Sequence, residues 1–103
     1  MQKNSSAAAR QLRALGHKLK PVVIVAGSGL SDNVIAEVDG ALSRHELIKV
    51  KLAVGDRRKK QAVAEELCER TGAEIVQSIG NIILVLRRTA KPDPRLSNLL
   101  RLK

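Results

Sequence analysis

The sequence has no aromatic side chain: its 103 residues include no Phe, Tyr or Trp. Modules that read single-stranded nucleic acid on a sheet or barrel face stack bases on such rings. Interfacial membrane anchors usually carry Trp or Phe as well. The composition therefore excludes base-stacking modules of that kind and argues against a membrane partner. Recognition of a nucleic acid would have to rest on phosphates, 2′-hydroxyls and arginine planes.

Cysteine is almost absent too. Cys68 is the single cysteine, so no intrachain disulfide can form, which fits a reducing compartment. We interpret Cys68 as a small buried side chain and not as a nucleophile. No apolar run has the length of a membrane span, and residues 1–6 lack the apolar core of a signal peptide. These features predict a cytoplasmic protein.

Groups that could perform catalysis are also scarce. His17 and His45 have neither a cysteine nor a second histidine at ligand spacing, so a metal site is not expected. The glutamates at 65, 66 and 69 are explained by a solvated helix surface. We therefore expect no enzyme activity, no metal, no other cofactor and no small-molecule substrate.

Acidic residues are outnumbered. The chain has 10 Asp and Glu against 19 Lys and Arg, which gives a formal net charge of +9. Such an excess predicts a polyanionic partner, with nucleic acid as the leading candidate. The length allows a single small domain, which we expect to be a binding module.

Residues 21–34 form the stretch around which the chain is organised. Val22 to Val25 predict a short strand covered on both faces or nearly so. Ser31 is a favourable N-cap, so a helix is expected to start there. Gly27 and Gly29 can adopt positive φ and allow a partner to approach the backbone closely. Together with the free amides of the helix start, they predict an anion site.

The use of this glycine turn stays open at this point. A lysine-type phosphate loop is excluded because Asp32 and Asn33 stand where Lys and Ser/Thr are required. A dinucleotide fingerprint would need glycine at position 32. The remaining interpretations are a turn whose glycines serve geometry alone and a loop that clamps a nucleic-acid backbone. The rival function is a protein that binds a small phosphate-containing ligand, such as a nucleotide, with the same loop.

Periodicity supplies the other elements. It predicts helices at residues 5–19, 32–45 and 56–71, a strand at 47–54, and a hairpin of strands 73–79 and 82–87 around Gly80 and Asn81. This α-β-α-β-α-β-β order predicts an α+β fold, a two-layer α/β sandwich with a four-stranded mixed sheet. Right-handed crossovers place the second and third helices on one face if both parallel steps move in the same direction. Residues 1–88 form the expected domain, and 89–103 a loosely held basic and apolar tail.

Cations gather in three places. The first helix carries a basic stripe, and Lys49 and Lys51 alternate with the apolar residues of the strand at 47–54. The start of the third helix holds four consecutive cations, where the helix dipole disfavours positive charge. Cations in such a position suggest a binding use.

Several short segments carry a resemblance to a known family. They are LGHKLKPVVI at 15–24, GL at 29–30, HELIKVK at 45–51, TGA at 71–73 and IG at 79–80, followed by an apolar strand and Arg87. Together they resemble a stand-alone CRM domain of the YhbY type over residues 12–88. The resemblance implies the fold of the C-terminal domain of a bacterial translation initiation factor, with sheet order 1-2-4-3 and the fourth strand antiparallel to the others. It also implies binding to ribosomal RNA in precursors of the large ribosomal subunit; plant relatives act in organellar intron splicing.

The RNA-contacting loop of that family is G-x-x-G, and only Gly29 matches it cleanly here. Ala26 replaces the first glycine, and Gly27 follows it. If position 26 needed positive φ, Ala26 would weaken the loop; if Gly27 supplies the flexibility, the loop would keep its function with a shifted turn. Leu86 stands where relatives often carry Tyr, which makes base stacking less expected here. The candidate RNA-binding residues are Ala26, Gly27, Ser28, Gly29, Arg10, Arg13, His17, Lys18, Lys20, Lys49, Lys51, Arg57, Arg58, Lys59, Lys60, Arg87 and Arg88.

Overall fold

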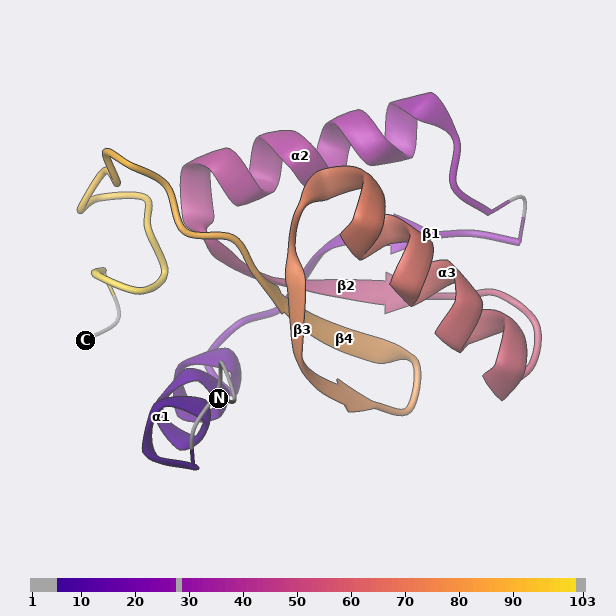
Figure 1. Ribbon diagram of the computed structural model, residues 1–103, viewed down its shortest axis with the longest axis horizontal. Coiled ribbons are helices and arrows are strands. Elements are labelled where there is room, and N and C mark those ends of the chain that lie inside the picture. The colour runs from indigo at the N-terminus through magenta and orange to yellow at the C-terminus, as the bar shows by residue number, and fades with distance from the viewer. Residues whose placement is uncertain (1–5, 28, 102–103) are drawn as a thin grey trace.

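The computed structural model describes residues 6–27 and 29–101 and has the predicted element order (Figure 1). The elements are α1 (Ser6–Gly16), β1 (Pro21–Val25), α2 (Asp32–His45), β2 (Leu47–Leu52), α3 (Arg57–Thr71), β3 (Glu74–Ile79) and β4 (Ile82–Leu86). Among the helices of these residues, none is long and apolar enough to span a membrane.

The four strands form one mixed sheet in the order β1-β2-β4-β3. Strands β1 and β2 are parallel, whereas β4 runs antiparallel to both β2 and β3. The expected strand order is therefore confirmed. The continuously apolar strand β4 lies inside the sheet, where both of its edges are hydrogen-bonded.

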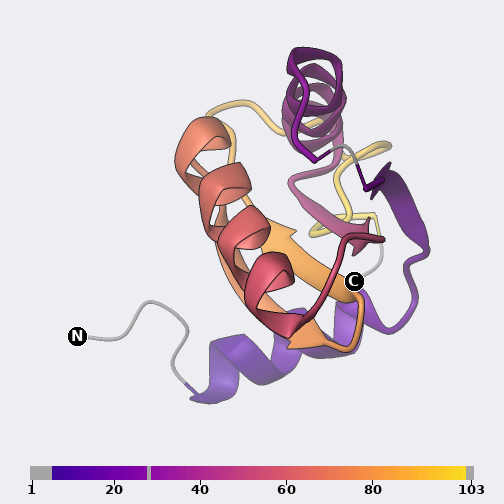
Figure 2. The same cartoon turned by 90° about the vertical axis from the view of Figure 1, so that its right-hand side faces the viewer.

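Helices α2 and α3 cover one face of the sheet and enclose the main core (Figures 1 and 2). Val38 and Leu42 of α2 and Leu67 of α3 are completely buried against strand residues such as Val50 and Val85. This arrangement is the predicted α/β sandwich. Strands β1, β2 and β3 run in the same direction, and the two connections through α2 and α3 step the same way across the sheet, so right-handed crossovers put both helices on one face.

Helix α1 packs on the opposite face, over one end of the sheet only (Figure 1). Leu12 and Leu15 bury a second cluster there with Leu47 and Leu84. The helix ends at Gly16, earlier than the predicted residue 19, and a Cβ at Gly16 would lie 2.6 Å from a methyl carbon of Leu84. The glycine thus permits the close approach of α1 to β4 and leaves the far end of this sheet face uncovered.

Residues 89–101 of the C-terminal tail are hydrogen-bonded to the rest of the domain, so the prediction of a loosely held segment was wrong for this part. Glu46, buried and with φ of 62°, accepts hydrogen bonds from Ser97 Oγ at 2.6 Å and from the Thr89 amide at 2.7 Å. Asn98 donates its amide to the His45 carbonyl at 2.9 Å and its side chain to the Leu47 carbonyl at 2.7 Å. Polar side chains, which hydropathy does not flag, therefore anchor the tail.

Strand β1 is not covered on both faces, as its apolar run had suggested. Val23 and Val25 face the helices, but Val22 and Ile24 are 52% and 60% exposed. The strand lies at the sheet edge, beyond the part of the lower face that α1 covers. The apolar run predicted burial on both faces, but the position of β1 at the edge of the sheet leaves one face exposed.

Candidate nucleic-acid interface

The turns that the sequence pointed to lie together at one end of the strands, where β1 and β2 finish. Because β1 and β2 are parallel, both end at this edge, and the Ala53 amide donates to the Val25 carbonyl at 2.8 Å. The turn between β3 and β4, at residues 80–81, lies at the same place, because the Leu52 amide donates a hydrogen bond to the Asn81 carbonyl at 2.6 Å. We call the described residues 26, 27, 29–31, 53–60 and 80–81 the loop edge; Figure 2 views the molecule from this side. Helices α2 and α3 both begin on this side of the molecule, at points well apart from one another (Figures 1 and 2).

The glycine loop between β1 and α2 is a tight turn. The Gly29 amide donates to the Ala26 carbonyl at 2.9 Å, and Gly29 has φ of +85°, which favours glycine. Among the described residues other than glycine, only Glu46 has positive φ, so Ala26 occupies its place without backbone strain. The exchange of the family's first glycine for alanine leaves the turn intact. Ser28 lies outside the described residues.

The fold does not require glycine at position 27. Its φ lies outside the left-handed region, so only Gly29 uses the freedom that the sequence allowed to both. A Cβ at Gly27 would meet no atom within 4 Å. The side of the turn at Gly27 is therefore open to a group that approaches the backbone from outside.

The start of α2 is capped as predicted and forms an ion pair with the end of α3. Ser31 Oγ accepts a hydrogen bond from the Val34 amide at 3.1 Å. Arg70, at the end of α3, lies 3.2 Å from the fully exposed Asp32 carboxylate and 3.5 Å from Glu66. Exposed ion pairs of this kind add little to stability. The contact between Arg70 and Asp32 does, however, join the end of α3 to the start of α2, and no local sequence pattern indicates it.

The first turn of α3 presents unpaired cations. Asp56 caps the helix by accepting from the Lys59 amide at 2.9 Å, and Lys60 is bonded to the Asn81 side chain. Arg57, Arg58 and Lys59 are exposed, and the described part of the chain offers their side chains no hydrogen-bond or ion-pair partner. Their charges add to the positive end of the helix dipole. An anion bound at the loop edge would relieve this repulsion.

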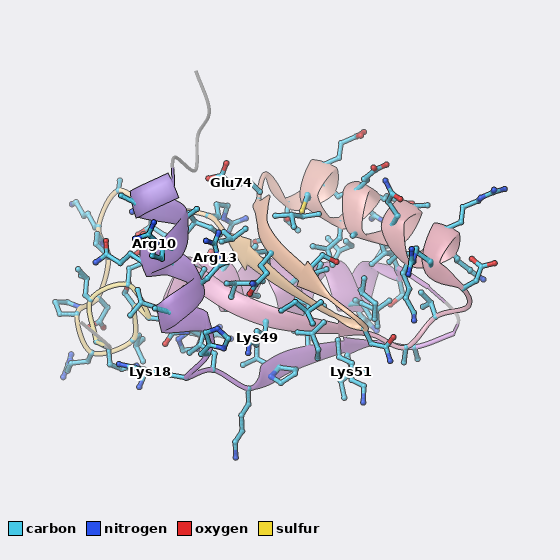
Figure 3. All side chains as sticks on the ribbon, turned by 90° about the horizontal axis from the view of Figure 1, so that it is seen from below. Arg10, Arg13, Lys18, Lys49, Lys51 and Glu74 are labelled. Carbon is cyan, nitrogen blue, oxygen red and sulfur yellow. The ribbon has the colours of Figure 1, made fainter. Side chains whose placement is uncertain are left out.

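A second basic region lies on the side of the molecule that carries α1 (Figure 3). The side chains of Lys49 and Lys51 are on the sheet face opposite α2 and α3, with Lys49 partly buried and Lys51 exposed. The remaining cations of this region lie on α1 or just after it, and all but the half-buried Arg13 are exposed: Arg10, Arg13, His17, Lys18 and Lys20.

The two arginines that follow β4 have different surroundings. Arg87 donates to the Asp39 carboxylate at 2.6 Å, the Thr71 carbonyl at 2.7 Å, and the Asp39 carbonyl and Ser43 hydroxyl at 2.9 Å. This guanidinium joins the sheet to both covering helices and has a structural task. Arg88 is exposed, and no partner for its side chain occurs in the described residues.

The groups considered for catalysis are not assembled into a site in the part of the chain that the structure describes. Burial, followed by the charge of Glu74, raises the pKa of the Cys68 thiol from 9.0 to about 11, so it stays protonated at neutral pH. Within residues 6–27 and 29–101, no cluster of three or more His, Cys, Asp or Glu side chains could hold a metal ion.

Comparison with known sequences decides the family. The sequence pattern of the CRS1 / YhbY (CRM) domain matches residues 5–87. The chain belongs to this family. A probable RNA-binding protein of Pseudomonas aeruginosa is 49% identical over 92 residues, which cover 89% of this chain and 88% of that protein. An RNA-binding protein of Haemophilus influenzae is 46% identical over 76 residues, 74% of this chain and 77% of its own length.

The fold of this CRM domain is also that of a solved structure. The solution structure of a hypothetical protein from Staphylococcus aureus superimposes with a TM-score of 0.72 at 35% identity, covering 81% of this chain and 86% of that one. The resemblance drawn from the short motifs is thereby confirmed. The predicted RNA contacts of individual residues stay predictions.

Proposed function

We propose that this CRM-domain protein binds RNA with its loop edge and the basic side of α1 and the sheet. The relatives named as RNA-binding proteins support this function. One observation carries it: Arg57, Arg58 and Lys59 stand unpaired at the start of α3, on the same sheet edge as the glycine loop. A phosphate backbone would supply the missing anions along that edge.

We further propose that the RNA is ribosomal RNA in precursors of the large ribosomal subunit, and that the protein acts there in the cytoplasm as a non-catalytic assembly factor. The family resemblance supports this assignment. The cations extend from the loop edge to α1, a wider area than one nucleotide covers, which favours a polymer over a small phosphate ligand.

Salt dependence of RNA binding tests the electrostatic part of the proposal. If about five phosphates of a single strand are neutralised, log affinity should fall with log salt concentration at a slope of about −3.5. Affinity can be measured by fluorescence anisotropy of a labelled RNA at several salt concentrations. A slope near zero would contradict the proposal.

Charge reversal tests the surface itself. Replacing Arg57, Arg58 and Lys59 together by Glu should weaken RNA binding far more than the same reversal of Arg44, Lys91 and Arg95. The control residues are exposed and lie near the end of α2 and in the tail, and the change in net charge is equal. Circular dichroism must show that both variants are folded. Equal losses would mean that only net charge matters.

The cellular RNA is tested by sedimentation. In a sucrose gradient of a cell extract, the protein should sediment with precursors of the large subunit, and the reversed α3 variant should stay near the top. A parent protein found only near the top would contradict the ribosomal assignment while leaving RNA binding intact.

A further inference from the structure

The sheet face beyond α1 carries large aliphatic side chains in the open. Strand pairing aligns Ile24 with Lys51, Lys51 with Ile82, and Ile82 with Ile79, so these residues form one row across all four strands. Ile24 and Ile79, at the two ends of the row, are each 60% exposed. Val22, on the same face of β1, is 52% exposed. We call these five residues the open row.

A groove separates the open row from the end of α1. It has a volume of about 180 Å³, and its lining combines apolar and polar side chains: His17, Pro21, Lys49, Gln77, Ile79, Ile82 and Leu84. Lys49 and Lys51 stand two residues apart on β2, so their Cα atoms are about 7 Å apart. That spacing is close to the distance between neighbouring phosphates of an extended nucleic-acid strand. The described residues offer neither lysine side chain a hydrogen-bonded partner.

The exposure of the open row has no explanation in the folding of the described chain. Helix α1 covers the sheet end around Leu47 and Leu84, and the tail packs beside it through Leu99. Neither segment reaches Ile24 or Ile79. Grouped exposed aliphatic side chains usually mark a surface that meets a partner. Here the partner must also satisfy two lysines.

We propose that the open row and its groove receive an unpaired segment of RNA, whose bases lie on the isoleucines while Lys49 and Lys51 contact its phosphates. This inference rests on the proposed RNA binding and names the form of RNA. Ile24 is followed after Val25 by the glycine loop, so a strand held at the loop edge continues directly onto this face. The flat faces of bases are apolar and can pack on aliphatic side chains in a chain without aromatic rings. In a duplex those faces are stacked on one another and are hidden.

Two polar side chains in the groove could read base edges. Gln77 offers both a donor and an acceptor, and His17 offers ring nitrogens at the end of α1. An acidic protein would satisfy the lysines as well, but the continuity of the face with the glycine loop favours RNA.

The test compares unpaired and paired RNA. Binding of a short unstructured RNA and of the same sequence annealed to its complement is measured by anisotropy for the parent protein, Ile24→Thr and Ile79→Thr. Both substitutions keep the charge and the β-branched shape and replace the ethyl group on Cβ by a hydroxyl. Ile75→Thr is the matched control, because Ile75 is an exposed isoleucine of β3 that faces the α3 side of the sheet.

Each open-row variant should lose about fivefold in affinity for the unpaired RNA, the order expected when one partly exposed aliphatic contact is removed. Affinity for the duplex, the slope with salt, and the melting temperature should stay unchanged. Ile75→Thr should bind both RNAs like the parent.

Other outcomes overturn the inference. Parent-like binding of the unpaired RNA by both variants, or equal losses for both RNAs, would show that bases do not lie here. If sedimentation velocity shows that Ile24→Thr disrupts an association of the parent, the open row binds a second copy or another protein. A parent that binds neither RNA would refute the proposed function itself, whereas a parent that binds with unaffected variants refutes only this inference.

Discussion

Arg87 and Asp39 form the ion pair that joins the sheet to its helical layer. The Arg87 guanidinium lies 2.6 Å from the Asp39 carboxylate and also reaches the Asp39 carbonyl, Ser43 and the Thr71 carbonyl. The strand β4, the helix α2 and the end of α3 thus meet at one side chain. Sequence reasoning had placed this arginine among the RNA contacts; its surroundings give it a structural task, and the RNA contact stays a prediction.

Replacing Arg87 by Ala should therefore lower the free energy of unfolding by about 2 kcal/mol, the order of a lost group of charged hydrogen bonds. Arg88→Ala, which removes the neighbouring exposed cation, should change stability by no more than about 0.5 kcal/mol. Urea denaturation followed by circular dichroism measures both. If the Arg87→Ala variant stayed folded and lost much more RNA affinity than Arg88→Ala, the result would indicate that Arg87 also contacts RNA directly.

Two helical glycines should respond to alanine with opposite signs. A Cβ at Gly16 would lie 2.6 Å from a Leu84 methyl carbon in the second core cluster. Gly16→Ala should destabilise the protein by about 1–2 kcal/mol through overpacking, despite the better helix propensity of alanine.

At Gly40 the nearest atom is the flexible end of the Arg44 side chain, at 3.3 Å. Gly40→Ala should therefore stabilise the protein by about 0.5–1 kcal/mol. Thermal denaturation of the pair is the measurement. Stabilisation by both substitutions would mean that α1 can move away from β4 without loss.

The hydroxyl of Ser97 holds the tail on the buried Glu46 carboxylate. Ser97→Ala should cost about 1–3 kcal/mol of stability, because it leaves a buried carboxylate oxygen without its donor. Ser78→Ala, at an exposed serine of β3, is the control and should be neutral. Limited proteolysis should cut the Ser97→Ala tail faster than the parent tail. Equal cleavage and equal stability would show that the hydrogen bonds of Asn98 and the apolar contact of Leu99 hold the tail without the Ser97 hydroxyl.

A substitution at Gly27 distinguishes two interpretations of the glycine loop: a loop that binds the RNA backbone and a turn that only reverses the chain. Neither φ nor packing requires glycine there, so Gly27→Ala should leave stability unchanged or raise it by about 0.5 kcal/mol. It should nevertheless weaken RNA binding about threefold, since a methyl group would stand between the backbone and an approaching phosphate. Gly40→Ala, remote from the loop edge, should bind RNA like the parent. Unchanged affinity for Gly27→Ala would assign the glycine to the turn alone.

Cys68 should react slowly in the folded protein. Its pKa of about 11 lies above the value of 9.0 for a free thiol, so the thiolate is rare at pH 8. Alkylation by iodoacetamide at pH 8 should be slow in buffer and fast in denaturant. The folded form holds this proton more tightly, so the contribution of the thiol to stability is constant below about pH 9 and declines toward pH 11. Rapid alkylation of the folded protein at pH 8 would contradict the raised pKa.

Local signals predicted most of the fold. Ser31 and Asp56 mark helix starts with side chains that cap the amides three residues on, as the hydrogen bonds confirm. Alternation along β2 placed Lys49 and Lys51 on the face away from the main core. These features depend on neighbours within one turn or one strand, which is why the sequence alone reveals them.

Long-range contacts were beyond that reasoning. The hold of Glu46 on Ser97 joins residues 51 positions apart, and no pattern in either segment indicates it. The same is true of the contact between Arg70 and Asp32, which joins the end of α3 to the start of α2, and of the contacts that Arg87 makes within the fold. The exposure of Ile24 followed from the sheet order and the short reach of α1, whereas the composition of β1 suggested burial.

The unpaired cations of the loop edge also set how the protein responds to its solution. Exposed like charges repel one another in the compact state, and dissolved ions screen that repulsion. The same ions compete with RNA phosphates for those side chains. A higher salt concentration should therefore raise the folding stability of the protein and lower its affinity for RNA. The free protein is then most stable under the conditions in which it binds RNA most weakly.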